Sequence, residues 1–348
     1  MRYGMRDGMR YGMRYVRGIY FIRVSSNTIK MTSWQQGIKQ VVDDAIDENN
    51  VLRIVLSPDV DGILATVIVG EYVRRAHGAT IEVIGTYDSC QVRLVPPSTM
   101  QDAKRALWVD IDTDVPGVQC IGQHFLGTIK AREGYFNPNL FFHVLTNMRH
   151  KCPISTTHLV LWGLFECETD ASPIFAHKFS LARSAVCHAD SLYIIVDDYR
   201  ENVVRWSTWL FPDGKLPATL SMLLDGTYRM KSIKVHHHML TCINNDVVHY
   251  SPLAPDWSSF KGRQSVGDEH HMETVNKLLQ LFSRWLKVSP PVMLPGESIG
   301  WKGSRVMLDT MKYDWCDPRF ESVLQEEGVV SHALVNSRIC SATVGVYF

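Results

Sequence analysis

Five aspartates lie in two short segments of the sequence, each directly after an apolar run: Asp59, Asp61, Asp110, Asp112 and Asp114. Carboxylates gathered at one place repel each other unless a cation neutralises them, and Mg²⁺ and Mn²⁺ prefer oxygen ligands. Two such ions about 4 Å apart clamp the attacking and the leaving oxygen of a phosphoester. The pattern therefore indicates metal-dependent hydrolysis. The alternative is that these aspartates cap helices and form turns, as Asp commonly does.

The elements around the aspartates must bring the two segments together. Runs at 51–56, 106–111 and 118–121 are apolar and β-branched, and they predict buried strands. A helical pattern continues to about residue 76 and is followed by a strand at 81–84. This alternation predicts an α/β fold with a mostly parallel sheet and helices on both faces. Ligands bind outside the carboxyl ends of the strands in such sheets, where both aspartate segments are expected.

Patterning divides the chain into three predicted parts. Residues 1–32 begin with a repeated Met-Arg-Tyr-Gly unit and are predicted to be a low-complexity, disordered tail. Residues 33–212 carry the predicted sheet and the aspartates. Residues 213–348 have weaker patterning, with one clear amphipathic helix at 273–286, and are predicted as a smaller α+β region of unknown role.

Composition narrows the class of protein. The 348 residues are 45% hydrophobic and carry no net charge, so a core is expected and no general attraction to nucleic acid. No run approaches the roughly 20 apolar residues of a membrane helix. The eight cysteines include no Cys-x-x-Cys pair, which favours buried reduced thiols over a zinc or redox site. We therefore expect no membrane partner and a reducing, cytoplasmic location.

The order of these motifs resembles the DHH family of phosphoesterases, which includes the RecJ-type nucleases. Ile-Val-Leu-Ser-Pro-Asp-Val-Asp-Gly at 54–62 is similar to the first family motif, and Leu-Trp-Val-Asp at 107–110 to the second. Ile-Gly-Gln-His-Phe at 121–125 stands in place of the Asp-His-His signature, and Asn-Pro at 137–138 is similar to an Asn-Pro of RecJ-like members. Asp190 is the candidate for the aspartate of the fourth motif.

The resemblance covers residues 51 to about 210 and implies a hydrolase with one or two Mn²⁺ or Mg²⁺ ions. It implies these metal ligands: Asp59, Asp61, Asp110 and Asp190. It also implies catalytic roles for Asp61 and for His124, which would stabilise negative charge on the phosphoryl oxygens. His124 and Asn137 are the substrate contacts that it implies.

Two further segments have residue types that suit phosphate. Lys302 and Arg305, in Lys-Gly-Ser-Arg, are candidate substrate contacts in the C-terminal region. The segment 153–157, Pro-Ile-Ser-Thr-Thr, is typical of a helix start, which either binds phosphate through its backbone N–H groups or is simply capped.

Three positions depart from the family pattern. Ser57 stands where the family has His or Asp, Gly122 replaces the signature Asp, and Gln123 replaces the first His. Each implied metal site therefore lacks one ligand. Gln123 still offers a carbonyl oxygen, and Asp112, two residues beyond Asp110 on an extended segment, is a candidate replacement ligand.

Three functions remain open from the sequence. The leading hypothesis is a nuclease-like phosphoesterase that cleaves phosphodiester bonds in single-stranded nucleic acid or short oligonucleotides. The lost ligands favour an alternative, a catalytically inactive DHH-like binding or scaffold protein. Zero net charge, and the absence from the sequence of the Gly-Gly-Gly-His type motif of RecJ-like accessory domains, favour a third, a phosphatase acting on a dinucleotide or pyrophosphate.

Overall fold

A computed structural model gives the structure of the chain, and parts of the sequence lie outside the residues that it describes. The described residues are 21–24, 27–30, 33–87, 91–113, 115–124, 132–142, 150–165, 185–187, 189, 199–225, 268–296, 299–302, 304–309, 329–336 and 339–344. The chain divides into two compact units, Met1–Ser33 and Trp34–Phe348. In the first, β1 (Phe21–Val24) pairs antiparallel with β2 (Asn27–Lys30), and the N-terminal repeat lies outside the described residues.

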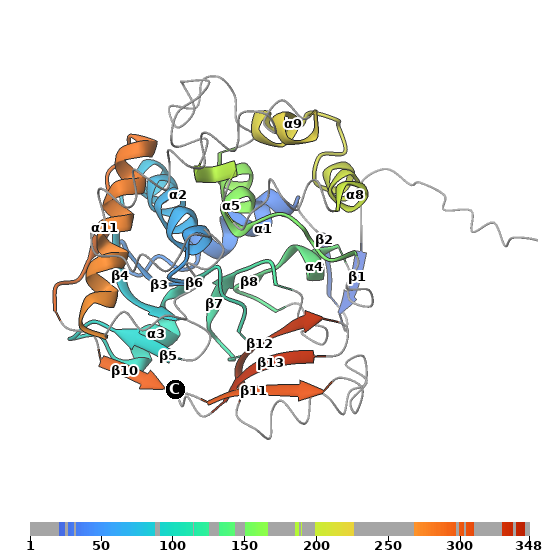
Figure 1. Cartoon of the computed structure of the whole chain (residues 1–348). Coiled ribbons are helices and arrows are strands. Elements are labelled where there is room, and N and C mark those ends of the chain that lie inside the picture. The colour runs from blue at the N-terminus through green and yellow to red at the C-terminus, as the bar shows by residue number, and fades with distance from the viewer. Residues whose placement is uncertain are drawn as a thin grey trace, which may run out of the picture. The chain divides into compact units, whose positions relative to one another are not determined.

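Eight of the described strands form one sheet in the second unit (Figure 1). They are β3 (Val51–Leu56), β4 (Thr80–Tyr87), β5 (Gln91–Leu94), β6 (Leu107–Val109), β7 (Gln119–Ile121), β8 (Tyr135–Phe136), β9 (Val292–Met293) and β10 (Ile299–Lys302). The order is β10-β5-β4-β3-β6-β7-β8, with β9 beside β4. From β4 to β8 the neighbours are parallel, and β5 and β10 are antiparallel. The predicted α/β class with a mostly parallel sheet is confirmed.

Helices pack on this sheet through two separate hydrophobic clusters. The helices are α1 (Trp34–Asp43), α2 (Val60–His77), α3 (Met100–Arg105), α4 (Pro138–Phe141), α5 (Thr156–Leu164), α8 (Arg200–Leu210), α9 (Ala218–Leu224) and α11 (Asp268–Leu286). In β3, Ile54 and Leu56 join the larger cluster with α1, α2, α5 and α11, whereas Val55 joins the smaller cluster with α3. Because successive strand residues face opposite sides, the two clusters lie on opposite faces of the sheet.

Elements from beyond residue 213 complete the principal sheet. β9 pairs with β4, β10 pairs with β5, and α11 packs on α2. β11 (Ser304–Asp309), β12 (Val329–Asn336) and β13 (Ile339–Val344) form a separate antiparallel sheet in the order β11-β13-β12. The predicted C-terminal region therefore supplies a helix and two strands to the body that carries the aspartates.

Two further expectations concern membranes and cysteines. Within the ranges that the structure describes, no helix combines the length and the apolar character needed to cross a membrane. The thiols of Cys120, Cys152 and Cys187 are buried. Burial raises the pKa of Cys152 to about 12, so this thiol stays protonated at neutral pH.

The turn from β3 to α2 closes tightly around Gly62. Asp59 is the N-cap of α2, and its carboxylate accepts a hydrogen bond from the Gly62 N–H at 2.9 Å. The backbone N–H of Ser57 donates to Val109 O on the neighbouring strand, which fixes the start of the turn. A Cβ on Gly62 would lie 2.3 Å from the backbone oxygen of Ser57. The turn that carries Asp59 and Asp61 therefore requires glycine at its end.

We expect Gly62→Ala to lower the free energy of unfolding by about 1–3 kcal/mol, because the added methyl group overpacks against backbone that cannot move away. Gly37→Ala in α1 is the matched control. Its Cβ would lie 3.4 Å from Phe136, an ordinary contact, and alanine favours the helix by about 0.5–1 kcal/mol. Urea unfolding of both variants tests this, and equal stabilities would contradict the close approach at Gly62.

Candidate functional site

The register of three parallel strands brings the predicted motifs to one edge of the sheet. Leu56 on β3 is opposite Val109 on β6, which in turn is opposite Ile121 on β7. The segments that follow these residues, 57–61, 110–112 and 122–124, therefore emerge side by side at the carboxyl edge. This is the convergence predicted for the two aspartate segments, apart from Asp114, which lies outside the described residues.

Asp110, the first residue after β6, has an unusual backbone conformation. Its φ is +60°, in the left-handed region that few residues other than glycine adopt. The predicted strand at 106–111 is therefore shorter in the structure, since β6 ends at Val109. The Asp110 N–H donates to Ile121 O at 2.8 Å, which holds the strained residue in place. Such strain persists only where surrounding contacts support it, and it clusters at functional sites.

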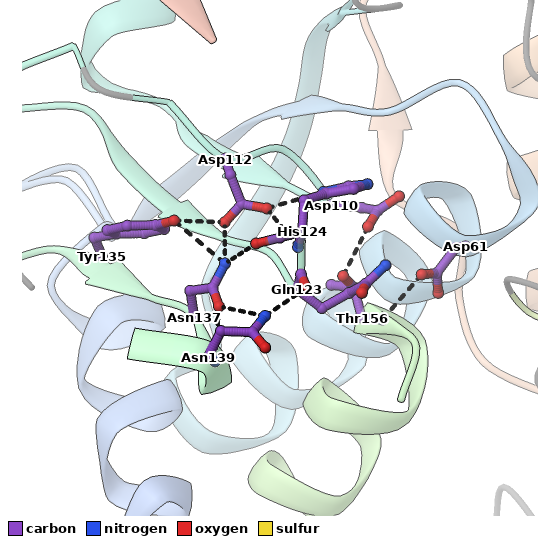
Figure 2. A network of polar contacts seen from close by, with 9 residues as sticks. All are labelled: Asp61, Asp110, Asp112, Gln123, His124, Tyr135, Asn137, Asn139 and Thr156. Carbon is purple, nitrogen blue, oxygen red and sulfur yellow. Dashed lines mark hydrogen bonds and ion pairs between the residues drawn. The ribbon is translucent and has the colours of Figure 1, made fainter. Parts of the chain in front are cut away.

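The carboxylates of Asp61 and Asp110 both bind the start of α5 (Figure 2). The two oxygens of Asp61 accept hydrogen bonds from the backbone N–H groups of Thr156 and Thr157, at 2.9 and 2.7 Å. The Thr156 hydroxyl donates to Asp110 Oδ1 at 2.7 Å. Asp61 and Asp110 are only 4% and 5% exposed. The first N–H groups of a helix lack intrahelical acceptors and lie at its positive end, so a carboxylate stabilises them.

Asp112 binds His124 instead of the helix. Its Oδ2 accepts hydrogen bonds from the His124 backbone N–H at 3.0 Å and from the ring Nδ1 at 2.9 Å. Its Oδ1 accepts from the Tyr135 hydroxyl at 2.7 Å and from Asn137 Nδ2 at 2.8 Å. Burial, followed by the negative charge of Asp112, raises the pKa of Tyr135 far above its usual range, so the phenol keeps its proton and donates. These contacts favour a role for Asp112 in holding His124 over direct metal ligation.

Two asparagines hold the backbone of the segment that carries Gln123 and His124. Asn137 Nδ2 donates to His124 O at 2.8 Å, and Asn139 Nδ2 donates to Gln123 O at 2.9 Å. Asn137 Oδ1 in turn accepts from the Asn139 backbone N–H, and Asn139 Oδ1 accepts from Cys152 N–H. Asn137, predicted to contact substrate, is 3% exposed and bonds to protein groups (Figure 2).

The structure brings together most of the predicted site residues but not all of them. Two hydrogen-bonded groups lie at the carboxyl edge: Asp61 and Asp110 with Thr156, and Asp112 with Gln123, His124 and the asparagines (Figure 2). Asn137 belongs to the second group. Asp59 caps α2 beside these groups. Asp190 lies outside the described residues, and Lys302 and Arg305 lie in β10 and β11, where the side chains are not described.

The metal prediction fits the donor chemistry in part. Asp61 and Asp110 are buried carboxylates that both hydrogen-bond to Thr156, and such oxygens suit Mg²⁺ or Mn²⁺. Among the described side chains there is no group of three His, Cys, Asp or Glu residues that could hold a metal ion. A full coordination shell would therefore need a further ligand, for which Asp190 is the predicted candidate.

Sequence reasoning missed the partners that hold the carboxylates. Thr156 and Thr157 are 95 and 96 residues from Asp61, and no local pattern connects them. The sequence of segment 153–157 is compatible with phosphate binding and with capping. In the structure Ser155 caps α5, while Asp61 takes the N–H groups of Thr156 and Thr157.

No protein-family model matches this chain, and neither do the curated proteins or the solved structures with which it was compared. The resemblance to DHH phosphoesterases therefore depends on the motifs and remains a proposal.

We expect Asp61→Ala to lower the free energy of unfolding by about 2–4 kcal/mol, since two buried backbone donors lose their acceptor and each costs about 1–3 kcal/mol. Asp59→Ala is the control, because it removes one N-cap hydrogen bond, worth about 1 kcal/mol. Denaturant unfolding without divalent metal measures both. A smaller loss for Asp61→Ala than for Asp59→Ala would show that the carboxylate does not hold α5.

His158, in the first turn of α5, is a further buried polar residue of this helix. It is completely buried, its Nδ1 lies 2.6 Å from Ser155 Oγ, and its ring lies 5.0 Å from that of Trp162. Among the described residues Nε2 has no hydrogen-bond partner. Burial lowers the pKa of His158 to about 3, so the ring is neutral in the folded protein at ordinary pH.

The burial of His158 predicts that the folded protein loses stability as the pH is lowered through a specific window. The unfolded chain takes up a proton at His158 near pH 6.5, whereas the folded chain does so only near pH 3. Between these values the unfolded state binds more protons than the folded state. The free energy of unfolding therefore decreases by up to about 1.4 kcal/mol for each unit by which the pH is lowered. Between pH 7.5 and about pH 5, we expect the parent to lose about 2 kcal/mol more than His158→Gln. Parallel losses in urea titrations would contradict this.

Proposed function

We propose that this chain is a metal-dependent phosphoesterase of the DHH type that cleaves phosphodiester bonds in single-stranded nucleic acid or short oligonucleotides. The observation that carries the proposal is the meeting of Asp61 and Asp110 at Thr156, at the carboxyl edge of the parallel strands. Two buried carboxylates joined to one residue are an expensive arrangement unless a cation or strong hydrogen bonds offset their charge. His124 supplies a ring on the adjacent strand end.

Each residue has a specific role in the proposed reaction. Asp61 and Asp110, together with Asp190, would hold Mn²⁺ or Mg²⁺, which would supply an activated water and neutralise charge on the phosphate. The side chain of His124 is 38% exposed, so it is accessible to phosphoryl oxygens and can stabilise the charge that develops on them. Helix α5 and the β3–α2 turn keep the two carboxylates in position.

One observation favours the second candidate, a catalytically inactive binding or scaffold protein. Buried carboxylates that serve no purpose cost stability, so their retention argues for a metal site. However, Asp61 accepts two backbone hydrogen bonds from α5, which gives the carboxylate a structural purpose without any metal. The hydrogen bonds of Asp61 are therefore compatible with both functions. A substitution at Asp110 discriminates better between them.

We expect Mn²⁺-dependent hydrolysis of a labelled single-stranded oligonucleotide that EDTA abolishes and that Asp110→Asn reduces at least about 100-fold. Asp110→Asn is preferred to Asp61→Ala, because asparagine keeps an oxygen for the Thr156 hydroxyl and leaves α5 capped. Asp44→Asn, at an exposed position, is the matched control and should retain the parent rate. A linear dinucleotide, assayed in parallel, identifies the substrate class.

The outcomes separate the three functions. Metal-dependent cleavage that is lost in Asp110→Asn supports the phosphoesterase, and preference for the dinucleotide would assign it to small-molecule substrates. If the parent cleaves neither substrate and Mn²⁺ does not raise its melting temperature, the scaffold function replaces the proposal, since a bound ion would stabilise the fold by mass action.

A further inference from the structure

The carboxylate of Asp112 occupies the space in which a side chain at position 122 would lie. A Cβ on Gly122 would be 2.2 Å from Asp112 Oδ2 and 2.4 Å from its Cγ. Real Cβ atoms do not approach other atoms so closely, so a substitution at Gly122 would displace the carboxylate. Gly122 is also the position at which the sequence departs from the acidic residue of the family signature. In this chain the carboxylate of Asp112, which follows the neighbouring strand β6, occupies the space beside Gly122.

Asp112 is held rigidly in that place. Its side chain is 1% exposed, and its two oxygens accept four hydrogen bonds, from the His124 backbone, the His124 ring, Tyr135 and Asn137. Two carboxylate oxygens offer about four acceptor sites, so these donors use the full capacity of the group. Figure 2 shows Asp112 between Tyr135 and Asn137 on one side and His124 on the other.

The contact with Asp112 has a consequence for the His124 ring. A carboxylate with no proton can only accept, so Nδ1 must carry the hydrogen that it donates to Asp112 Oδ2. A partner on one ring nitrogen fixes the tautomer and the orientation of a histidine. Nε2 is the second ring nitrogen and takes no part in this contact, and the His124 side chain as a whole is 38% exposed.

We propose that Asp112 is a positioning residue for His124: from the end of β6 it fills the space over Gly122 and holds Nδ1 as a donor, so that the Nε2 edge of the ring meets the phosphoryl oxygens of the substrate. The part about substrate rests on the proposed phosphoesterase function. The hold of Asp112 on the ring does not, and it can be tested in the absence of substrate and metal.

The first test moves the carboxylate from position 112 to position 122 in the full-length chain. Asp112→Ala removes the carboxylate, Gly122→Asp places a second one against it, and the double variant returns a single carboxylate to the same space from the other strand. The readout is the ¹⁵N chemical shift of both His124 ring nitrogens at about pH 8.5, where a neutral histidine shows its tautomer. His124→Gln assigns the signals in protein labelled at histidine.

We expect one tautomer, with hydrogen on Nδ1, in the parent and a mixture of tautomers in Asp112→Ala. Gly122→Asp alone should lower the melting temperature by several degrees, because its side chain collides with Asp112. The double variant should recover both the Nδ1–H signature and most of the melting temperature. An unchanged His124 signature in Asp112→Ala, or an unchanged melting temperature in Gly122→Asp, would overturn the proposal.

Asp112→Asn is a second variant in case Asp112→Ala does not fold. Asparagine has the same shape but puts an N–H₂ group where one pair of donors needs an acceptor. We expect a changed His124 signature or a lost hydrogen bond to Tyr135, detected as a changed shift of the tyrosine hydroxyl. Retention of both signals at parent values would overturn the proposal.

A catalytic readout separates this inference from the proposed function. If the parent hydrolyses phosphodiesters, Asp112→Ala should lower kcat by about 10–100-fold, as loss of an orienting partner typically does, and the double variant should regain at least 10-fold. If the parent hydrolyses nothing, the phosphoesterase proposal fails, and the ring tautomer alone decides the role of Asp112. A parent-like kcat in Asp112→Ala of an active enzyme would overturn the positioning role.

Discussion

The hydrogen bonds from the first turn of α5 to the carboxylate of Asp61 are the interaction on which the rest of the site depends. They join a turn after the first parallel strand to a helix that begins 95 residues later, and the same helix turn reaches Asp110 through the Thr156 hydroxyl. Because α5 also packs on α1 and α2, the position of the carboxylates is tied to the larger hydrophobic cluster. A buried charge is thus placed where helix N–H groups and their dipole stabilise it.

The acidic residues at this edge divide into two environments, and the division has chemical meaning. Asp61 and Asp110 both accept hydrogen bonds from backbone and hydroxyl donors in the first turn of α5. Asp112 instead uses both oxygens on His124, Tyr135 and Asn137. The first environment suits a cation, and the second suits the orientation of an imidazole. Three aspartates of similar sequence context therefore have different hydrogen-bond partners in the folded chain.

Local patterns predicted two of the strands that lead into the site almost to the residue. The apolar run at 51–56 coincides with β3, and the strand predicted at 118–121 agrees with β7 to within one residue. Hydrophobic periodicity records which face of an element is buried, and that information is local. The same patterns did not reveal that β9 and β10 join the principal sheet, because pairing with β4 and β5 depends on contacts between residues about 200 positions apart.

By itself, the sequence determined the α/β class, the strand ends at which the aspartates lie and the residue types available for chemistry. Only the tertiary structure decided what each carboxylate does. Asp61, a predicted metal ligand, accepts hydrogen bonds from the first turn of α5, while Asp112, a predicted replacement ligand, accepts four from His124, Tyr135 and Asn137. The reason is physical: a carboxylate has the same chemistry wherever it stands, and the donors that reach it come from segments that only folding brings together.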